Sequence, residues 1–306
     1  MTVTLSSFGS QFDTAFHQNT NKLNPGAGEL ALFRALKDTL SSFPGAFRIE
    51  EYHGGRYQVT FTGDRRHARH LARCELGDLM IVTYSSHKPE IRLTYLQAKF
   101  ERHQLGLGCR RLFDANLEQW FLLRKRPRVS GYGTFNPPAD LLQSALLDSV
   151  GSFVFFFKDT NKAGFQCHYA SASYLQPIGT APRRYGKVQL KGPCRVHLVK
   201  GYKECLAACS NQTFAQSLYD LQIGTPLDPV VQATQGTRDW LAGHLSRLIG
   251  GAQGAGRLPP PLATDLLERL RPSHDFNREP IRGGSFGARA LVILQSDSRS
   301  VNETSR

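Results

Sequence analysis

The hydrophobic positions in the first third of the chain change from a helical period to a strand period. Apolar side chains recur every three or four residues over 28–43, which predicts an amphipathic helix. Apolar runs at 47–52 and 57–62 predict one β-hairpin, and runs at 79–84 and 91–100 predict a second. The run 79–84 is apolar at nearly every position, as in a strand covered on both faces.

The rest of the chain carries shorter patterns of both kinds. Strand-like runs occupy 152–158, 166–175 and 288–294. Helix-like segments occupy 140–150, 204–221, 230–249 and 262–270. The expected fold class is therefore α/β, a mixed sheet flanked by helices with a C-terminal α+β extension.

Pattern and composition together divide the chain into four segments. They are a polar, irregular N-terminal segment (1–25), an α/β core (26–160), a basic α+β extension (161–295) that contains a Gly- and Pro-rich linker (250–261), and a disordered tail (296–306).

The chain is strongly basic. It has 38 Lys and Arg against 25 Asp and Glu, a formal net charge of +13 over 306 residues. Between residues 160 and 203 there are eight Lys and Arg and no acidic residue. A surplus of this size is typical of proteins that bind a polyanion, above all nucleic acid. The alternative is a basic surface without such a partner.

Nothing in the sequence indicates a membrane or a secreted protein. No apolar run is long enough for a transmembrane helix, and the first eight residues lack the pattern of a secretory signal. Six cysteines spread over the chain are too few for a disulfide scaffold. We therefore expect a cytoplasmic protein with no membrane partner.

Acidic, amide and amino side chains stand at matching ends of the second predicted hairpin. Asp78 precedes its first strand, and Gln97 and Lys99 lie near the end of the other. In an antiparallel pair they come to the same sheet end, and residues 97 and 99 project from one face. Asp78 and the backbone carbonyl of Ala98 could then bind Mg²⁺, while Lys99 orients or deprotonates an attacking water. The alternative is an ordinary hairpin with a capping aspartate and a solvated lysine.

These residues resemble the catalytic core of the restriction-endonuclease-like PD-(D/E)xK nuclease superfamily, in the Gln-x-Lys variant of Mrr-type enzymes and antiphage defence nucleases. The resemblance covers residues 26–125 and implies a restriction-endonuclease-like α-β-β-β-α-β core. It makes Asp78 the metal-binding aspartate, Gln97 the residue at the D/E position and Lys99 the catalytic lysine. Glu29, on the first helix, matches an additional metal ligand. Gln97 is uncharged where the commoner pattern has an acid, which weakens the expected metal site.

Glu75 lies three residues before Asp78 and has two interpretations. It can join the metal ligands, with Mg²⁺ or Mn²⁺ as cofactor. It can equally end a short helix over 65–73 and pair with an arginine, which is the interpretation we favour.

Basic residues on both sides of the hairpin can contact the phosphates of double-stranded DNA without reading its sequence. They are Arg65, Arg66, Arg69, Arg73, Arg110, Arg111, Arg124, Lys125, Arg126, Arg183, Arg184 and Lys187.

One further set has the residue types of a zinc site: Cys194, His197, Cys205 and Cys209. Two of its cysteines lie in the apolar segment Cys-Leu-Ala-Ala-Cys, where buried thiols are equally expected. We expect free thiols there and no zinc.

Together these features predict a Mg²⁺-dependent DNA endonuclease or nuclease-like effector. By resemblance its setting is restriction or antiphage defence, with a partner defence protein or as a homo-oligomer. The alternative is a catalytically inactive nucleic-acid-binding or assembly protein that keeps the same fold.

Overall fold

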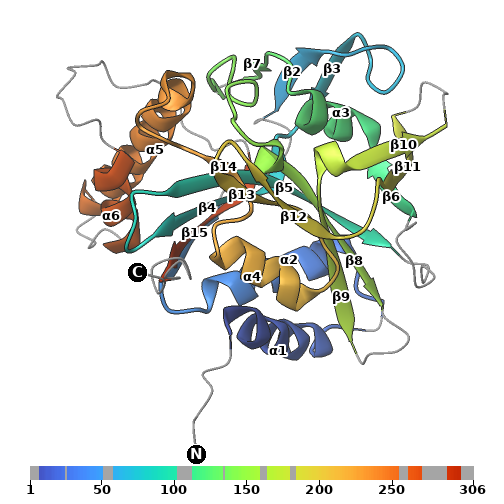
Figure 1. The fold of residues 1–306 in the computed structure, drawn as a ribbon, viewed down its shortest axis with the longest axis horizontal. Helices are drawn as coiled ribbons and strands as arrows, with labels where there is room; N and C mark the ends of the chain where they lie inside the picture. The colour runs from blue at the N-terminus through green and yellow to red at the C-terminus, as the bar shows by residue number, and fades with distance from the viewer. Residues whose placement is uncertain are drawn as a thin grey trace, which may run out of the picture.

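The protein is a mixed α/β structure built on one large mixed sheet (Figure 1). The computed structural model describes residues 7–24, 26–50, 58–101, 112–133, 135–158, 164–179, 184–254, 261–270 and 288–297. None of the helices within these ranges is both long and apolar enough to cross a membrane.

The large sheet runs in the order β1-β15-β4-β5-β8-β9-β13-β12, and β14 pairs with β5. The strands are β1 (Ala46–Glu50), β15 (Ala288–Ser296), β4 (Gly77–Ser85), β5 (Ile91–Glu101), β8 (Gly151–Lys158), β9 (Phe165–Ser171), β13 (Tyr202–Ala208), β12 (Arg195–Val199) and β14 (Thr225–Pro226). The pairs β15–β4 and β5–β8 are parallel, and the other pairs are antiparallel.

Two small sheets lie beside the large one. The first joins β10 (Leu175–Ile178), β11 (Tyr185–Leu190) and β6 (Leu112–Asn116). The second joins β3 (Leu71–Cys74), β2 (Val59–Thr62) and β7 (Ser130–Gly131).

Helices cover both faces of the large sheet. One face carries α1 (Phe8–Asn21), α2 (Glu29–Ser41) and α4 (Asn211–Tyr219), below the sheet in Figure 1. The other face carries α3 (Leu117–Lys125), α5 (Gln235–Gly254) and α6 (Pro261–Leu270). Three short 3₁₀ turns complete the elements, η1 (Asp148–Val150), η2 (Ala172–Tyr174) and η3 (Gln232–Thr234).

The two helical layers explain why β4 is apolar at nearly every position. Leu79 and Ile81 pack into the core under α1, α2 and α4, whereas Met80 and Val82 pack into the core under α3, α5 and α6. Side chains that alternate between the two faces of the sheet are therefore all buried, as expected for a strand that is apolar at nearly every position. The predicted hairpin of 79–84 with 91–100 is confirmed as β4 and β5.

Other elements differ from the sequence-based expectation at the N-terminus and in the first hairpin. Residues 8–21, expected to be irregular, form α1, because Ser7 caps the helix and Phe12 and Phe16 are buried one turn apart. The hairpin expected from 47–52 and 57–62 does not form among the described residues. Its first strand, β1, pairs with β15, and its second, β2, pairs with β3 and β7.

Three helix predictions are wrong in part. Residues 140–150 form turns that end in η1, and the segment 65–73 forms bends that lead into β3 rather than a helix. Residues 202–208 form β13, because pairing with β9 and β12 buries a segment whose Leu and Ala residues favour a helix in isolation. Only the second part of the predicted helix 204–221 is helical, as α4.

The predicted segment boundaries also change. The boundary at residue 160 falls between β8 and β9, which pair with each other, and β15 returns to pair with β4, so the large sheet crosses it. Of the linker expected over 250–261, residues 250–254 belong to α5 and Pro261 begins α6, while 255–260 lie outside the described residues. Ser296 belongs to β15, and the tail expected after it lies, beyond Asp297, outside the described residues.

Candidate functional site

Polar side chains meet where β15, β4 and β5 lie side by side. Asp78 stands one position beyond the last paired residues of β4 and β5, Leu79 and Leu96. The parallel pairs Ala288–Gly77 and Ala290–Leu79 place Arg289 beside Asp78 on the other side. By strand alternation, Asp78, Gln97 and Arg289 start from the same face of the sheet.

Asp78 is almost fully buried and makes two contacts. Its Oδ2 accepts a hydrogen bond of 2.8 Å from the backbone N–H of Ala98, and its Oδ1 lies 3.3 Å from Nε of Arg289. The first contact ties the carboxylate to β5, one residue from Lys99. The second places a positive charge against the oxygen that a metal ion would need.

Glu75 shares the same arginine. Its Oε2 lies 3.4 Å from Nε of Arg289. Burial raises the pKa of the Glu75 carboxyl, Arg289 opposes that rise, and the charge of Asp78 adds to it. Burial disfavours the charge of Arg289, but Asp78 and Glu75 outweigh it and raise the pKa of the guanidinium. The interpretation of Glu75 as the partner of an arginine holds, although the arginine comes from β15 and not from 65–73.

Lys99 and Glu29 form the other ion pair of the site, with Nζ 3.4 Å from Oε1. Glu29 is the first residue of α2, where its negative charge is favoured by the helix dipole. Because α2 packs against β5 and β15, its first turn lies near the end of β5 that carries Lys99. The helix therefore supplies a carboxylate to the sheet end.

Gln97 is fully buried between β4 and β8, opposite Phe153. Neither its Oε1 nor its Nε2 has a hydrogen-bond partner among the described residues. Leaving a buried amide without partners costs roughly 1–3 kcal/mol.

The donor set fits a divalent cation in type but is not arranged as a finished site. Carboxylate oxygens are the ligands that Mg²⁺ and Mn²⁺ prefer, and the site offers Glu29, Glu75 and Asp78. In the part of the chain that the structure describes, these oxygens do not all come within 4.8 Å of one another. Arg289 bridges two of the carboxylates, so its side chain, about half exposed at 49%, would have to turn away before a metal ion could bind both of them.

Arg289 is the residue of the site that the sequence does not reveal. It lies 211 positions after Asp78 in chain numbering, in a run that predicts only a strand. The parallel pairing of β15 with β4 brings it into place, and no short-range pattern indicates which strand a distant strand will join.

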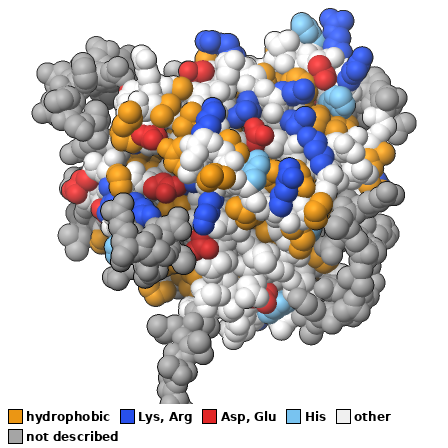
Figure 2. Space-filling view, in the orientation of Figure 1, with side chains coloured by type: hydrophobic (Ala, Val, Ile, Leu, Met, Phe, Trp, Pro, Cys, Tyr) orange, Lys and Arg blue, Asp and Glu red, His pale blue; other side chains and the backbone are white. Residues whose placement is uncertain are grey.

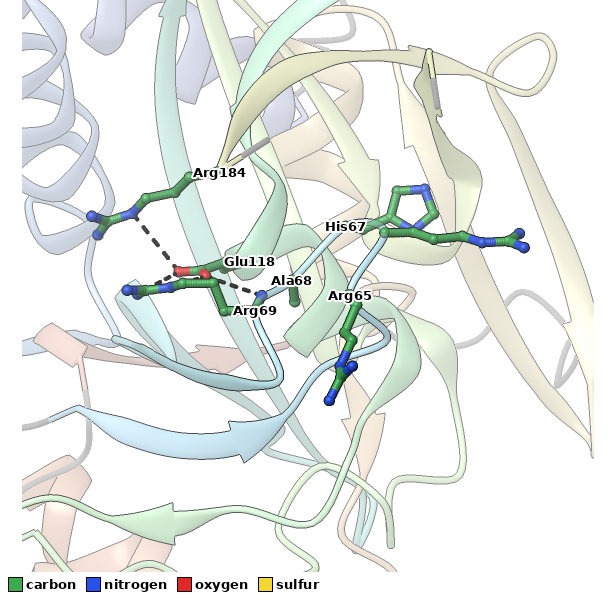
Figure 3. Close-up of a pocket in the computed structure, with 7 residues that line it drawn as sticks. Arg65, His67, Ala68, Arg69, Glu118 and Arg184 are labelled. Carbon is green, nitrogen blue, oxygen red and sulfur yellow. Dashed lines mark hydrogen bonds and ion pairs between the residues drawn. The ribbon is translucent and has the colours of Figure 1, made fainter. Parts of the chain in front are cut away.

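The arginines predicted to contact DNA include a group that surrounds a buried acid. Arg65, Arg66, Arg69 and Arg184 line a small cavity of about 80 Å³ together with Glu118 (Figure 3). Three hydrogen bonds join Arg69 to Glu118, two from the guanidinium at 2.6 and 3.2 Å and one from the backbone N–H at 3.3 Å. Nε of Arg184 lies 3.8 Å from the same carboxylate. The carboxylate of Glu118 therefore offsets part of the positive charge of the arginines around it.

Several other predicted DNA contacts are engaged within the protein. Arg124 donates to the carbonyl of Ser173, Arg126 donates to the carbonyl of Ala145, and Lys187 pairs with Asp114 at 3.0 Å. Arg73 lies over the ring of Tyr132, and Lys125 is exposed. The remaining three, Arg110, Arg111 and Arg183, lie outside the described residues.

The basic side chains are distributed unevenly over the surface. Figure 2 shows Lys and Arg across the upper half of the face in view, whereas α1 and α4, in the lower half, contain neither residue type. A polyanion would therefore meet its complementary charge away from these two helices.

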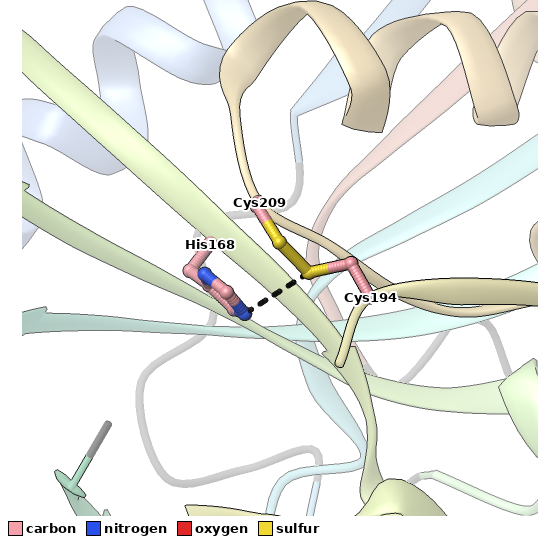
Figure 4. Close-up of side chains that lie close together, drawn as sticks. All are labelled: His168, Cys194 and Cys209. Carbon is pink, nitrogen blue, oxygen red and sulfur yellow. Dashed lines mark hydrogen bonds between the residues drawn. A yellow bond between two sulfur atoms is a disulfide. The ribbon is translucent and has the colours of Figure 1, made fainter. Parts of the chain in front are cut away.

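The cysteine and histidine set expected to hold free thiols is divided between two sides of the sheet. Cys205 is a buried free thiol in the core under α1, α2 and α4. Cys194 packs against the opposite core and forms a disulfide with Cys209 (Figure 4), so the expectation of free thiols is wrong for these two. His197 hydrogen-bonds Glu204 at 3.0 Å, and the four residues do not form one cluster.

The sheet end thus brings together Asp78, Lys99 and Glu29, adds Glu75 and Arg289, and buries Gln97 alongside them. Comparison of the chain with protein-family models, with curated proteins and with solved structures finds no match.

Proposed function

We propose that this protein is a divalent-metal-dependent endonuclease that hydrolyses phosphodiester bonds in double-stranded DNA. One observation carries the proposal. Asp78 and Lys99, predicted from a local motif, lie at the same end of β4 and β5, and α2 adds Glu29 to them. An acid, an amine and a second acid from a helix are the groups that metal-assisted phosphodiester hydrolysis needs.

The order of elements supports a restriction-endonuclease-like core. Without β2, β3, β6 and β7, which belong to the two small sheets, the chain order α2, β1, β4, β5, α3, β8 is compatible with the α-β-β-β-α-β order that the resemblance implies. Asp78 lies on the second of these strands and Gln97 and Lys99 on the third. We take β15, which lies between β1 and β4, as an addition to this core.

Each side chain of the site has a distinct task under this proposal. Asp78 would hold Mg²⁺ or Mn²⁺, with Glu29 and Glu75 as further carboxylate donors. When bound, such an ion lowers the pKa of a water ligand and polarises a phosphate oxygen. Lys99, released from Glu29, places its ammonium beside the attacking water and the phosphate.

Gln97 and Arg289 complete the arrangement. The amide of Gln97 can donate to or accept from a group at the reaction centre, which would satisfy atoms that lack partners among the described residues. Arg289, turned from Asp78 and Glu75, can neutralise the DNA phosphate that enters. Its guanidinium would then pair with the two carboxylates before substrate binds and with the phosphate afterwards.

The basic surface supports DNA as the substrate. Arg65 and Arg66 are exposed on the loop between β2 and β3, and Lys125 is exposed at the end of α3. Contacts of this kind bind the DNA backbone and position the duplex without reading its sequence. Restriction or antiphage defence, with a partner protein or a second copy of the chain, is the biological setting that we propose by resemblance.

Cleavage of supercoiled plasmid DNA tests the proposal directly. The wild-type chain should nick or linearise the plasmid with Mg²⁺ or Mn²⁺ and leave it intact with a chelator. Asp78→Asn and Lys99→Met should abolish this activity while DNA retardation in a gel persists. Asp140→Asn and Lys22→Met, at exposed positions that are not among the site residues, are matched controls that should cut as the wild type does.

A second function has its own support. Arg289 pairs with two of the carboxylates, and an amide stands where an acid is commoner, so the same fold could bind nucleic acid without cutting it. Salt-dependent DNA binding with no cleavage under either metal ion would establish this second function and refute the first.

A further inference from the structure

A second group of metal-ligating side chains lies on the far part of the large sheet. His168 comes from β9, Cys194 immediately precedes β12, and Cys209 immediately follows β13. One ligand atom of each lies within 4.8 Å of the other two, and Nε2 of His168 is 3.9 Å from Sγ of Cys194 (Figure 4). Within the described ranges, this is the one group of three or more His, Cys, Asp or Glu side chains gathered so closely.

The pairing of three strands produces this convergence. Ala208 pairs with Tyr169, so the next residue along β13 reaches the level of His168. Arg195 pairs with Ala207, which brings Cys194 beside the same end of β13. Ser210, the N-cap of α4, holds the chain directly after Cys209. The backbone positions are therefore set by the sheet and by a helix start, before any bond between the side chains forms.

The chemistry of the three groups differs from that of the other cysteines. Cys74, Cys167 and Cys205 are buried, and burial raises the pKa of the Cys205 thiol to about 11, which keeps it protonated near neutral pH. Cys209 is exposed and Cys194 is half-buried, so solvent, metal ions and oxidants can reach their sulfur atoms. Two accessible thiolates and an imidazole nitrogen form the kind of ligand set that zinc prefers.

We propose that His168, Cys194 and Cys209 bind Zn²⁺ when the two cysteines are reduced, and that the disulfide is the metal-free, oxidised form of this site. A small ligand such as water would fill the fourth position, as in other zinc sites with three protein ligands. The site is independent of the carboxylates around Asp78, and the proposal does not rest on the endonuclease function.

Oxidised glutathione converts the zinc-bound form into the disulfide form, and two molecules of reduced glutathione, which become oxidised glutathione, supply the electrons for the return. The two zinc-bound thiolates give up two electrons and join in a sulfur–sulfur bond, and Zn²⁺ leaves. The electrons break the disulfide of the reagent and yield two glutathione thiolates, so atoms and charge balance. Reduction followed by addition of Zn²⁺ reverses the step.

Metal content and absorption spectra test the proposal. Reduced full-length protein is loaded with ZnCl₂, freed of unbound metal and analysed by elemental mass spectrometry, which should find about one zinc per chain. Cys194→Ser, Cys209→Ser and His168→Gln should lower the content to background. His197→Gln and Cys205→Ser are matched controls from the nearby sequence that should retain it. Co²⁺ in place of Zn²⁺ should give thiolate-to-metal absorption in the wild type and in these controls.

The outcomes separate the proposal from a purely structural disulfide. Reduced wild-type protein that retains no zinc, or zinc that survives Cys194→Ser and Cys209→Ser, would overturn it. A chromogenic zinc indicator monitors the wild type during addition of oxidised glutathione, so this test does not depend on the folding of any variant. Release of zinc in step with loss of two free thiols is expected, and retention of zinc after disulfide formation would also overturn the proposal.

Discussion

Replacing Arg289 by methionine should tighten the binding of a divalent cation to the site in the absence of DNA. The guanidinium lies 3.3 Å from Asp78 and 3.4 Å from Glu75, so it occupies the oxygens that a cation would bind. Methionine keeps much of the apolar stem of the side chain and removes the charge. Counting Lys99 and Arg289 against three carboxylates, the formal charge of the site changes from −1 to −2.

The size of the effect follows from Coulomb's law with a discount for solvent. A unit charge and a divalent cation about 4 Å apart interact by about 2 kcal/mol at the dielectric constant of water. The side chain of Arg289 is 49% exposed, so the value for water, rather than the larger value for a buried pair, is the appropriate one. Removing this repulsion corresponds to binding that is roughly 30-fold tighter.

Electron paramagnetic resonance of free Mn²⁺ measures this affinity directly, with no DNA and no turnover. Arg48→Met is the matched control. Arg48 lies on β1 of the same sheet and also pairs with a carboxylate, that of Asp38 on α2. Arg289→Lys should fall between the wild type and Arg289→Met. Equal Mn²⁺ affinity in the wild type and Arg289→Met would refute the idea that the arginine competes with the metal ion.

Three other measurements test the surroundings of the site and the fold. Gln97→Met should raise the free energy of unfolding by roughly 1–3 kcal/mol in urea, because it removes a buried amide without partners among the described residues, and should reduce plasmid cleavage; destabilisation would contradict this account. Glu118→Gln frees Arg69 and Arg184, so the slope of log K against log salt for DNA binding should steepen by about one unit, and an unchanged slope would place DNA elsewhere. Burial and Arg247 lower the pKa of His244 to about 3, so this group makes stability fall as pH drops from its unfolded pKa near 6.5 toward 3. Between pH 6 and pH 4, the free energy of unfolding measured in urea should fall more steeply in the wild type than in His244→Gln, by up to about 1.4 kcal/mol per pH unit. Equal slopes in the two proteins would show that His244 titrates normally.

The part of the site that the sequence predicts is the part that local structure determines. β4 and β5 are neighbours in the chain, and a polar turn between two apolar runs is enough to set Asp78 opposite Gln97. Glu29 follows from the helical period before the hairpin, which the structure confirms as α2. These side chains depend on contacts over a short stretch of chain, where period and turn residues carry the information.

The parts that the sequence does not predict depend on which distant segments pair. A leucine- and alanine-rich segment such as 204–208 favours a helix by itself, but it becomes β13 because strands on both sides take up its backbone. An irregularity in the pairing of β13 with β12, where Ala207 and Cys205 pair with consecutive residues, interrupts the alternation. Cys205 therefore lies in one core, whereas Cys194 and Cys209 lie on the other side with His168. The spacing of the cysteines in the sequence predicts neither the strand nor the side of the sheet on which each cysteine lies.

The pairing of β15 with β4 decides more about the site than any other feature outside the hairpin. It closes one side of β4 and thereby buries Asp78, and it introduces the only charge that pairs with both Asp78 and Glu75 in the part of the chain that the structure describes. A buried carboxylate needs a compensating charge when no cation is bound, and Arg289 supplies it. The same contact must be given up for a metal ion to bind. Because the arginine is half exposed at the sheet end, an approaching phosphate offers it a replacement partner, so entry of DNA and loading of the metal should favour each other.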